Sequence, residues 1–350
     1  MRYKLLGKSG LRVSELCLGT MTFGEDWGWG ASKDESRQIF DTFVEAGGNF
    51  IDTANGYTDG SSEKIVGELI AKDRERFVVA TKYSFPLQMN ENQKNPNGSG
   101  NHRKNLIQSL EGSLKRLNTD YIDLFWLHAW DFTTPIEEVL RSLDDVVRQG
   151  KVLYIGISNA PAWIISQANT IAQYQGWTQF VALQVEYSLI QRTPERDLIP
   201  MAKALDLAVT PWSPLGGGVL TGKYNKPAQP GDEQGRLTNA ALGSISERNL
   251  AIADVVSQVA EEIGQTPSQV ALAWLHAQTG VIIPIIGARK LSQFQDNLAA
   301  LDVTLSPAHL QRLNEVSQIQ LGYPHEFLQS DLIRDRLFGG TFNTIDNHRL

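Results

Sequence analysis

The feature that most constrains the fold is an alternation, along almost the whole chain, of short apolar segments with segments of helical periodicity. The apolar segments are mostly continuous in hydrophobic residues, as expected for strands that are buried on both faces. Eight such strands are expected, at residues 15–18, 50–52, 77–81, 122–127, 154–157, 182–185, 207–210 and 281–285. Helices are expected at residues 34–46, 62–70, 105–117, 135–149, 162–174, 197–205, 246–278 (two helices) and 291–301. Eight consecutive β–α units predict a (β/α)8 barrel, the TIM-barrel architecture.

The alternative architecture is an open, doubly wound sheet. Such a sheet carries the pattern G-x-G-x-x-G after its first strand, and the segment Gly19-Thr20-Met21-Thr22-Phe23-Gly24 does not fit that pattern. No proline-rich linker divides the chain. We therefore expect residues 1–350 to form one barrel domain, with an N-terminal hairpin at residues 3–13 and a C-terminal tail at residues 318–350.

Composition excludes several classes of protein. The 32 Lys and Arg residues against 39 Asp and Glu residues give a net charge of −7, and no long basic run is present, so we expect neither nucleic acid nor an anionic membrane as a partner. The single cysteine, Cys17, excludes an internal disulfide framework and a Cys-rich zinc site, and we expect no metal. No apolar run approaches the ~20 residues of a membrane span, and residues 1–4 lack the apolar core of a secretory signal. The expected location is the cytoplasm, and the oligomeric state is left open.

Three long loops follow expected strands, at residues 20–31, 83–101 and 212–243. Loops of this length inside a compact domain are usually functional. In a barrel, the C-terminal ends of the strands form the functional face. We therefore expect the three loops to build one mouth.

Four polar residues follow the second, third and fourth strands: Asp52, Tyr57, Lys82 and His128. Each alone has an ordinary structural explanation, as a turn cap, a turn aromatic, a solvated strand end or a core histidine. Neighbouring strands of a barrel would, however, bring all four together. An ammonium group beside a phenol lowers the pKa of the phenol, a carboxylate holds the ammonium in place, and an imidazole can orient a carbonyl group. Such a set supplies a proton to a carbonyl oxygen but no electrons, so a hydride-donating cofactor is required.

At this point the residues resemble the aldo-keto reductase superfamily, over about residues 3–305. Residues 49–54 (Asn-Phe-Ile-Asp-Thr-Ala), followed by Gly56-Tyr57 and Ser62-Glu63, are similar to the aspartate–tyrosine signature of that family. Lys82 and His128 fall at the other two positions of its catalytic tetrad. Residues 156–159, 184–187 and 287–297 match further motifs in the order that the family shows. The resemblance implies a barrel, a nicotinamide cofactor and hydride transfer to a carbonyl group.

The resemblance also implies a role for each matching residue. Tyr57 would be the general acid, tuned by Lys82 and Asp52, and His128 would orient the carbonyl group. Ser158, Asn159 and Gln184 would hold the carboxamide of the nicotinamide, and Trp212 would stack on its ring; Asp52 is also expected among the cofactor-binding residues. Three residues at the end of the first strand would approach the cofactor: Gly19, Thr20 and Met21. The pyrophosphate would be lined by residues of the long loop near the C-terminal half: Ser213, Leu215, Gly217, Lys223 and Arg236. The adenosine end would be held by Gly287, Arg289, Gln293, Asp296 and Asn297.

Arg289 can also be interpreted from its position alone. It lies between a strand end and a helix start, where backbone N–H groups attract phosphate, and its planar guanidinium group suits phosphate. This favours NADP(H) over NAD(H); the alternative is that Arg289 and Lys290 are simply solvated.

Two departures from the family pattern raise alternatives. Asp296 stands where glutamate is usual, which would loosen the adenine contact. Trp212 replaces the more common tyrosine and is similar to the branch that contains aryl-alcohol dehydrogenases and potassium-channel β subunits. A cofactor-sensing regulatory subunit with little turnover is therefore a second hypothesis, although the channel branch departs from histidine at the position of His128.

A third interpretation comes from residues 217–224, which nearly match the phosphate-binding pattern G-x-x-x-x-G-K-[ST]. The pattern ends on Tyr224, so the hydroxyl group that binds magnesium is misplaced. We therefore do not favour a nucleotide triphosphatase.

The substrate pocket is the least constrained part of the site. Trp27, Trp29, Tyr83 and Trp130 lie in or next to the mouth loops and would form an aromatic pocket for aryl or apolar aldehydes; the alternative is that they pack loops against the barrel. Residues 322–350 carry Tyr323, Phe327, Leu337 and Phe338 and are a candidate cover for the mouth. Together these features predict an NADPH-dependent reductase that converts small-molecule aldehydes or ketones to alcohols.

Overall fold

Eight parallel strands form one sheet in the computed structural model, which describes residues 1–88, 94–225 and 245–346. The strands, in spatial order around the sheet, are β10 (Ile285–Ile286), β3 (Cys17–Gly19), β4 (Phe50–Asp52), β5 (Val78–Tyr83), β6 (Ile122–Leu127), β7 (Val152–Ser158), β8 (Phe180–Glu186) and β9 (Ala208–Trp212). A parallel bridge between Val209 and Ile282 joins β9 to the segment before β10 and closes the ring. The expected (β/α)8 barrel is confirmed.

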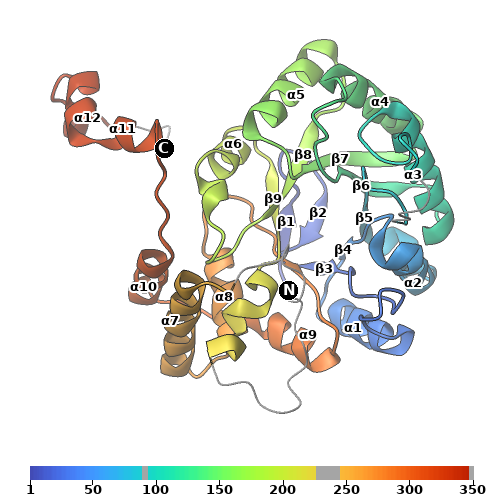
Figure 1. Ribbon diagram of the computed structural model, residues 1–350, viewed down its shortest axis with the longest axis horizontal. Coiled ribbons are helices and arrows are strands. Elements are labelled where there is room, and N and C mark those ends of the chain that lie inside the picture. Colours follow the sequence, from blue (N-terminus) through green and yellow to red (C-terminus); the bar gives the residue numbers. More distant parts are fainter. Residues whose placement is uncertain (89–93, 226–244, 347–350) are drawn as a thin grey trace.

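Helices surround the strands (Figure 1). The ring consists of α1 (Lys33–Glu45), α2 (Ser61–Ile70), α3 (Arg103–Leu117), α4 (Ile136–Arg148), α5 (Ala162–Gln175), α6 (Leu198–Ala204), α7 (Glu247–Ile263), α8 (Pro267–His276) and α9 (Leu291–Leu298). Three further helices follow: α10 (Pro307–Ser317), α11 (His325–Gln329) and α12 (Asp331–Phe338). These three helices were not expected from the sequence, although Ser306 before Pro307 is a favourable helix start and its hydroxyl group accepts a hydrogen bond from the His309 amide.

The core has two layers because successive side chains of each strand point to opposite faces. One layer fills the barrel and includes Phe50, Leu124 and Trp126; the other lies between the strands and the helices. Packing inside the barrel is tight: a Cβ atom at Gly156 would lie 2.3 Å from the Trp126 ring. Glycine at this position therefore allows β7 to pass the largest side chain of the interior.

The N-terminal hairpin closes one end of the barrel. Strands β1 (Tyr3–Leu5) and β2 (Arg12–Ser14) pair antiparallel, as expected, and the fully buried side chains of Leu6 and Val13 pack into the interior layer. With that end closed by the hairpin, the opposite, C-terminal face is the end of the barrel where a ligand is expected.

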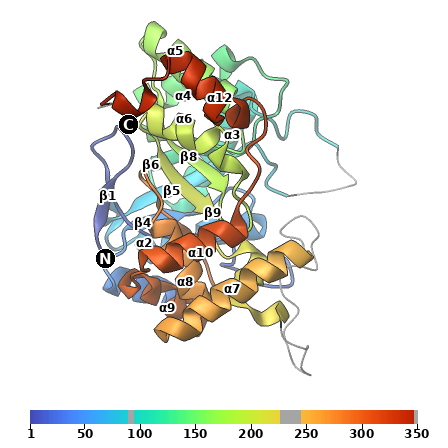
Figure 2. The same cartoon turned by 90° about the vertical axis from the view of Figure 1, so that its left-hand side faces the viewer.

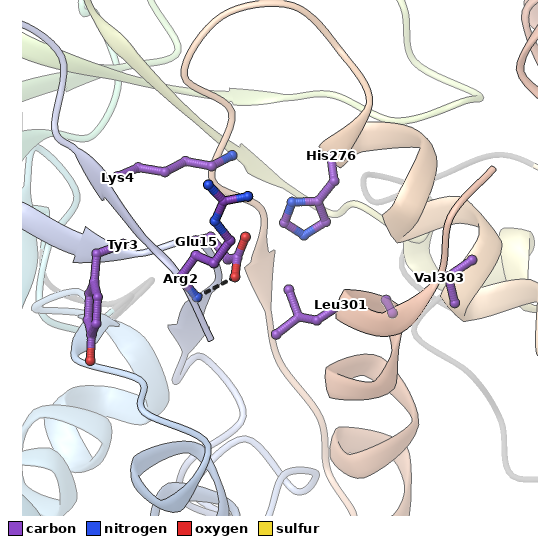
Figure 3. Close-up of a pocket in the computed structure, with 8 residues that line it drawn as sticks. Arg2, Tyr3, Lys4, Glu15, His276, Leu301 and Val303 are labelled. Atoms are coloured by element: carbon purple, nitrogen blue, oxygen red, sulfur yellow. Dashed lines mark hydrogen bonds between the residues drawn. The ribbon is translucent and has the colours of Figure 1, made fainter. Parts of the chain in front are cut away.

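The hairpin also borders a pocket of about 330 Å³ on its own side of the barrel (Figure 3). Arg2, Lys4, Glu15 and His276 point toward one another there. Burial, with the nearby Lys4 ammonium, lowers the pKa of His276 to about 4. This pocket is separated from the C-terminal face by the packed barrel interior.

Helices α1 and α9 are tied together by a carboxylate. The Ser32 hydroxyl group caps α1 by accepting a hydrogen bond from the Glu35 amide. The Glu35 carboxylate does not return to the start of its own helix; its Oε1 accepts a hydrogen bond from the Leu291 amide at the start of α9. This contact fixes the position of α9 beside the mouth.

The C-terminal tail does not cover the mouth. Figure 1 shows α11 and α12 outside the helix ring, joined to α10 by an extended segment. None of the residues of these two helices is buried. Among the described residues, no helix is both long enough and apolar enough to span a bilayer.

Candidate active site

The four polar residues identified in the sequence meet at the C-terminal face. Lys82 lies near the end of β5 with a fully buried side chain, and its Nζ donates to Asp52 Oδ2 at 2.5 Å. The same ammonium group donates to the Thr53 carbonyl at 2.7 Å and to the Tyr57 hydroxyl oxygen at 3.1 Å. The strands β4 and β5 are neighbours, so their ends place these groups side by side.

These three contacts show that Lys82 is charged. A protonated amine has three N–H donors, and all three have acceptors here. Burial alone would lower the pKa of Lys82, but the Asp52 carboxylate and the Tyr57 hydroxyl group outweigh burial and raise the pKa above its usual value. Because the Tyr57 oxygen accepts from Lys82, this contact does not use the Tyr57 proton.

The backbone after Tyr57 is strained and firmly held. Thr58 (φ 45°) and Asp59 (φ 53°) adopt left-handed conformations that are unusual for these residues, above all for a β-branched threonine. The Thr58 hydroxyl group donates to the Phe23 carbonyl at 2.7 Å, and Trp27 Nε1 donates to Asp59 Oδ1 at 3.1 Å. The turn therefore fixes the position of Tyr57 by contacts with the first mouth loop.

His128 follows β6 and lies across from Tyr57. The two ring centroids are 6.2 Å apart in an edge-on arrangement. Burial, together with the Lys82 charge, lowers the pKa of His128 well below its usual value, so the ring is neutral at physiological pH. A neutral imidazole donates through one nitrogen, as the orienting of a carbonyl oxygen requires.

A second polar network joins this group to strands β7, β8 and β9. Gln184 Nε2 donates to Asp52 Oδ1 at 3.0 Å, which holds the carboxylate from the side opposite Lys82. Asn159 Nδ2 donates to the His128 carbonyl at 2.8 Å and to Ser158 Oγ at 2.9 Å. Trp212 Nε1 donates to Asn159 Oδ1 at 3.3 Å. The residues expected at the nicotinamide thus surround the tetrad, and the bond from Gln184 to Asp52 was not foreseen.

The expected contacts from the first strand lie at the same rim. Gly19 ends β3 and pairs with Asp52 of β4. The side chain of Thr20 is fully buried, and its hydroxyl group donates to the Asp52 carbonyl at 3.0 Å, while Met21 is half-buried. A Cβ atom on Gly287 would lie 3.0 Å from the Gly19 carbonyl oxygen, so the two strands approach closely where the cofactor is expected.

The loop after β9 folds into two short 3-10 turns, Gly216–Thr221 and Lys223–Asn225. Ser213 Oγ accepts a hydrogen bond from the Gly217 amide at 3.1 Å, and Leu215 is half-buried against the core. Residues 223–225, where the helix of a phosphate-binding loop would begin, form a 3-10 turn. Arg236 lies outside the described residues.

The start of α9 carries the groups expected at the adenosine end. Gln293 Oε1 accepts a hydrogen bond from the Arg289 amide at 3.3 Å, and Asn297 is buried. Asp296 has partners that the sequence did not suggest: its carboxylate accepts hydrogen bonds from Thr266 Oγ1 and Gln269 Nε2, each at 2.9 Å. Asp296 therefore also ties α9 to the start of α8.

One expected substrate residue, Tyr83, lies away from the mouth. Tyr83 is fully buried and stacks on Phe125 in the layer between strands and helices, with ring centroids 5.2 Å apart. Lys82 points into the barrel mouth, so its neighbour on the strand must point the other way. Phe85, which was not among the expected site residues, lies two residues further on, with its ring centroid 4.6 Å from that of His128. The alternation of side chains along β5 could have excluded Tyr83, but it ends with the strand at Tyr83; Ser84 has a positive φ of 110°, so the chain turns before Phe85 and no strand pattern indicates that residue.

The other expected aromatic residues keep positions near the mouth. Trp27 and Trp29 have ring centroids 5.7 Å apart, and Trp27 reaches Asp59 beside Tyr57. Trp130 is partly buried and packs against the layer between strands and helices.

The fold and the site together define a (β/α)8-barrel protein with an acid–base group at the open end of the barrel. The model of the aldo/keto reductase family matches residues 15–318. The norsolorinic acid reductase of Aspergillus flavus is 38% identical over 330 residues, which cover 93% of this chain and 83% of the relative. The aryl-alcohol dehydrogenase [NADP(+)] of Phanerodontia chrysosporium is 39% identical over 329 residues, which cover 90% and 86% of the two chains.

The chain belongs to the aldo/keto reductase family. It is therefore an oxidoreductase that acts on small-molecule carbonyl compounds, in a family that generally uses nicotinamide cofactors.

Proposed function

We propose that the protein reduces aldehydes or ketones to alcohols with NADPH, and that Tyr57 donates the proton. The observation that carries the proposal is the charged, fully buried Lys82 between Asp52 and the Tyr57 hydroxyl group, with distances of 2.5 Å and 3.1 Å. A cation at this position stabilises the negative charge that remains on the phenol oxygen after proton transfer.

The roles divide among this chain's own residues. Tyr57 donates a proton to the carbonyl oxygen as that oxygen gains charge. Lys82 does not donate to substrate, because its three N–H groups are already used. Neutral His128 donates a hydrogen bond that orients the carbonyl group, and Gln184 keeps Asp52 aligned with Lys82.

The residues around the tetrad fit a nicotinamide dinucleotide. Ser158, Asn159 and Gln184 offer the mixed donors and acceptors that a carboxamide needs, with Trp212 beside them. When bound, the cofactor supplies the hydride that this chain's side chains lack. At the other end of the site, the first-turn N–H groups of α9 and the Arg289 guanidinium group suit a phosphate.

The test of the proposal is NADPH consumption, followed by absorbance, with a panel of aryl and aliphatic aldehydes and ketones. We expect turnover with aryl aldehydes. Binding of NADPH without turnover on any member of the panel would instead support the cofactor-sensing regulatory subunit.

Arg289→Ala should remove most of the preference for NADPH. A charge-assisted hydrogen bond to the extra phosphate is lost, so the dissociation constant for NADPH should rise by roughly 10- to 100-fold, while that for NADH stays nearly constant. Fluorescence titration measures both constants. Lys203→Ala, which removes an exposed cation on α6, is the control; equal affinities of the unaltered protein for NADPH and NADH would refute the assignment.

Phe85→Ala should raise KM for benzaldehyde by roughly tenfold, since an aromatic contact contributes about 1 kcal/mol beyond its buried area. KM for a small aliphatic aldehyde should change little. Tyr83→Phe is the matched control, because the Tyr83 side chain is buried away from the mouth. If Tyr83→Phe changed KM and Phe85→Ala did not, the pocket would be lined as the sequence had suggested.

A further inference from the structure

The C-terminal arm, defined as residues 318–346, has an apolar surface that the rest of the described chain does not cover. Eight of its large apolar side chains are between 37% and 85% exposed: Tyr323, Phe327, Leu328, Leu332, Leu337, Phe338, Phe342 and Ile345. Helices α11 and α12 have five and eight residues. Isolated helices of this length are unstable in water, and exposed apolar surface of this extent marks an interaction site.

The arm is joined to the barrel only near its base. Arg196 Nη2 donates to the Gln320 carbonyl at 2.6 Å, and His325 Nε2 lies 3.3 Å from Asp197 Oδ1. Beyond these contacts, α11 and α12 pack on each other and not appreciably on the described helices or strands of the barrel. Ring pairs within the arm, Tyr323–Phe327 and Phe338–Phe342, hold it as a projecting unit (Figures 1 and 2).

Helix α5 offers a matching surface. Trp163 and Tyr174 are 62% and 88% exposed. They are eleven residues apart, close to three helical turns, so they lie on the same face. The sequence of α5, AWIISQANTIAQYQ, contains no charged residue. Exposed aromatic side chains without nearby charges on the same helix are typical of the core of a protein–protein interface.

We propose that the arm of one copy of this chain docks on α5 of a second copy, and that the second arm docks on the first copy in the same way. Figures 1 and 2 show α12 at the same end of the molecule as α5, and α6 lies between them in Figure 1. An arm that does not reach its own α5 can reach that of a copy related by a two-fold axis, and two-fold dimers are the commonest assemblies.

The exposed apolar area of the arm is large enough for an interface with a second copy of the chain. If each large side chain exposes roughly 200 Å² when free, the eight side chains expose on the order of 800 Å² together. A stable interface buries about 800 Å² on each partner. The two reciprocal contacts of a dimer therefore provide at least the area that a stable complex needs.

Light scattering after gel filtration tests the assembly. The full chain should have twice the chain mass. Leu332→Asp in the arm and Trp163→Glu on α5 should each raise the dissociation constant of the dimer by about 30-fold or more. Leu5→Glu, which changes an exposed leucine of the hairpin, is the matched control and should leave the dimer intact. A full chain that is monomeric throughout, or a dimer that survives both substitutions, overturns the proposal.

Cross-linking tests the pairing itself and does not depend on the stability of the variants. One copy carries Leu332→Cys and a differently tagged copy carries Tyr174→Cys; the native Cys17 is buried and does not interfere. Mild oxidation of the mixture should link the two tags. Absence of that link, or a Leu332→Cys/Tyr174→Cys double variant that links only within single chains, shows that the arm does not dock on a second copy.

Discussion

Tyr57→Phe is expected to lower kcat by about 100- to 10,000-fold, the range that a general acid contributes. The substitution removes only the hydroxyl group, which accepts from Lys82 Nζ at 3.1 Å and which we propose as the proton donor to the carbonyl oxygen. The strained turn at Thr58 and Asp59 and its contacts with the first mouth loop remain in place. The defect should therefore appear in the chemical step, measured by single-turnover absorbance.

The affinity for NADPH separates this result from misfolding. Tyr57→Phe should bind NADPH about as well as the unaltered protein, because Arg289, the start of α9 and the groups around Gln184 are unchanged. His128→Ala is the comparison: it should raise KM for the carbonyl compound as well as lower kcat. If Tyr57→Phe kept full turnover, another group would be the acid.

Lys82→Met is expected to have the second large effect, and it should act on both stability and turnover. The Asp52 side chain is only 4% exposed, and the substitution leaves its carboxylate without the opposite charge. Breaking a buried ion pair by removing one partner costs about 3–5 kcal/mol. Urea denaturation should show that loss, and kcat should fall by roughly 100-fold or more, because no cation then stabilises the deprotonated Tyr57.

The double variant Lys82→Met/Asp52→Asn distinguishes the two effects. Removing the unpaired charge should restore much of the free energy of unfolding, since an amide in place of the carboxylate can still accept from Gln184 Nε2. Turnover should stay low. Recovery of turnover together with stability would mean that Lys82 has only a structural role.

The barrel and the tetrad could be predicted from the sequence for one reason: in a closed parallel barrel, every strand ends at the same rim. Once eight strands are placed in order, Asp52, Lys82 and His128 are expected at the same rim. This expectation requires no knowledge of the side-chain contacts. The helix bounds also follow from local signals and agree to within a few residues.

What the sequence did not show depends on register and on distant contacts. Tyr83 is the last residue of β5, and Phe85 follows a turn at Ser84, whose φ is 110°, so the sheet pattern that places Tyr83 does not extend to Phe85. Asp296 binds Thr266, thirty residues away, and nothing local indicates this pair. The C-terminal tail was a candidate cover for the mouth, but the base of the arm is fixed by Arg196 and Asp197 at the start of α6, and its helices project outside the ring.

The most direct test of the central claim uses NADPH that carries deuterium at both C4 positions of the nicotinamide, with an aryl aldehyde as substrate in ordinary water. Mass spectrometry and proton NMR of the alcohol locate the label. We expect one deuterium on the former carbonyl carbon and none retained on oxygen, with formation of this product nearly abolished by Tyr57→Phe. An alcohol without deuterium on that carbon, or oxidation of NADPH with no alcohol formed, would contradict the account.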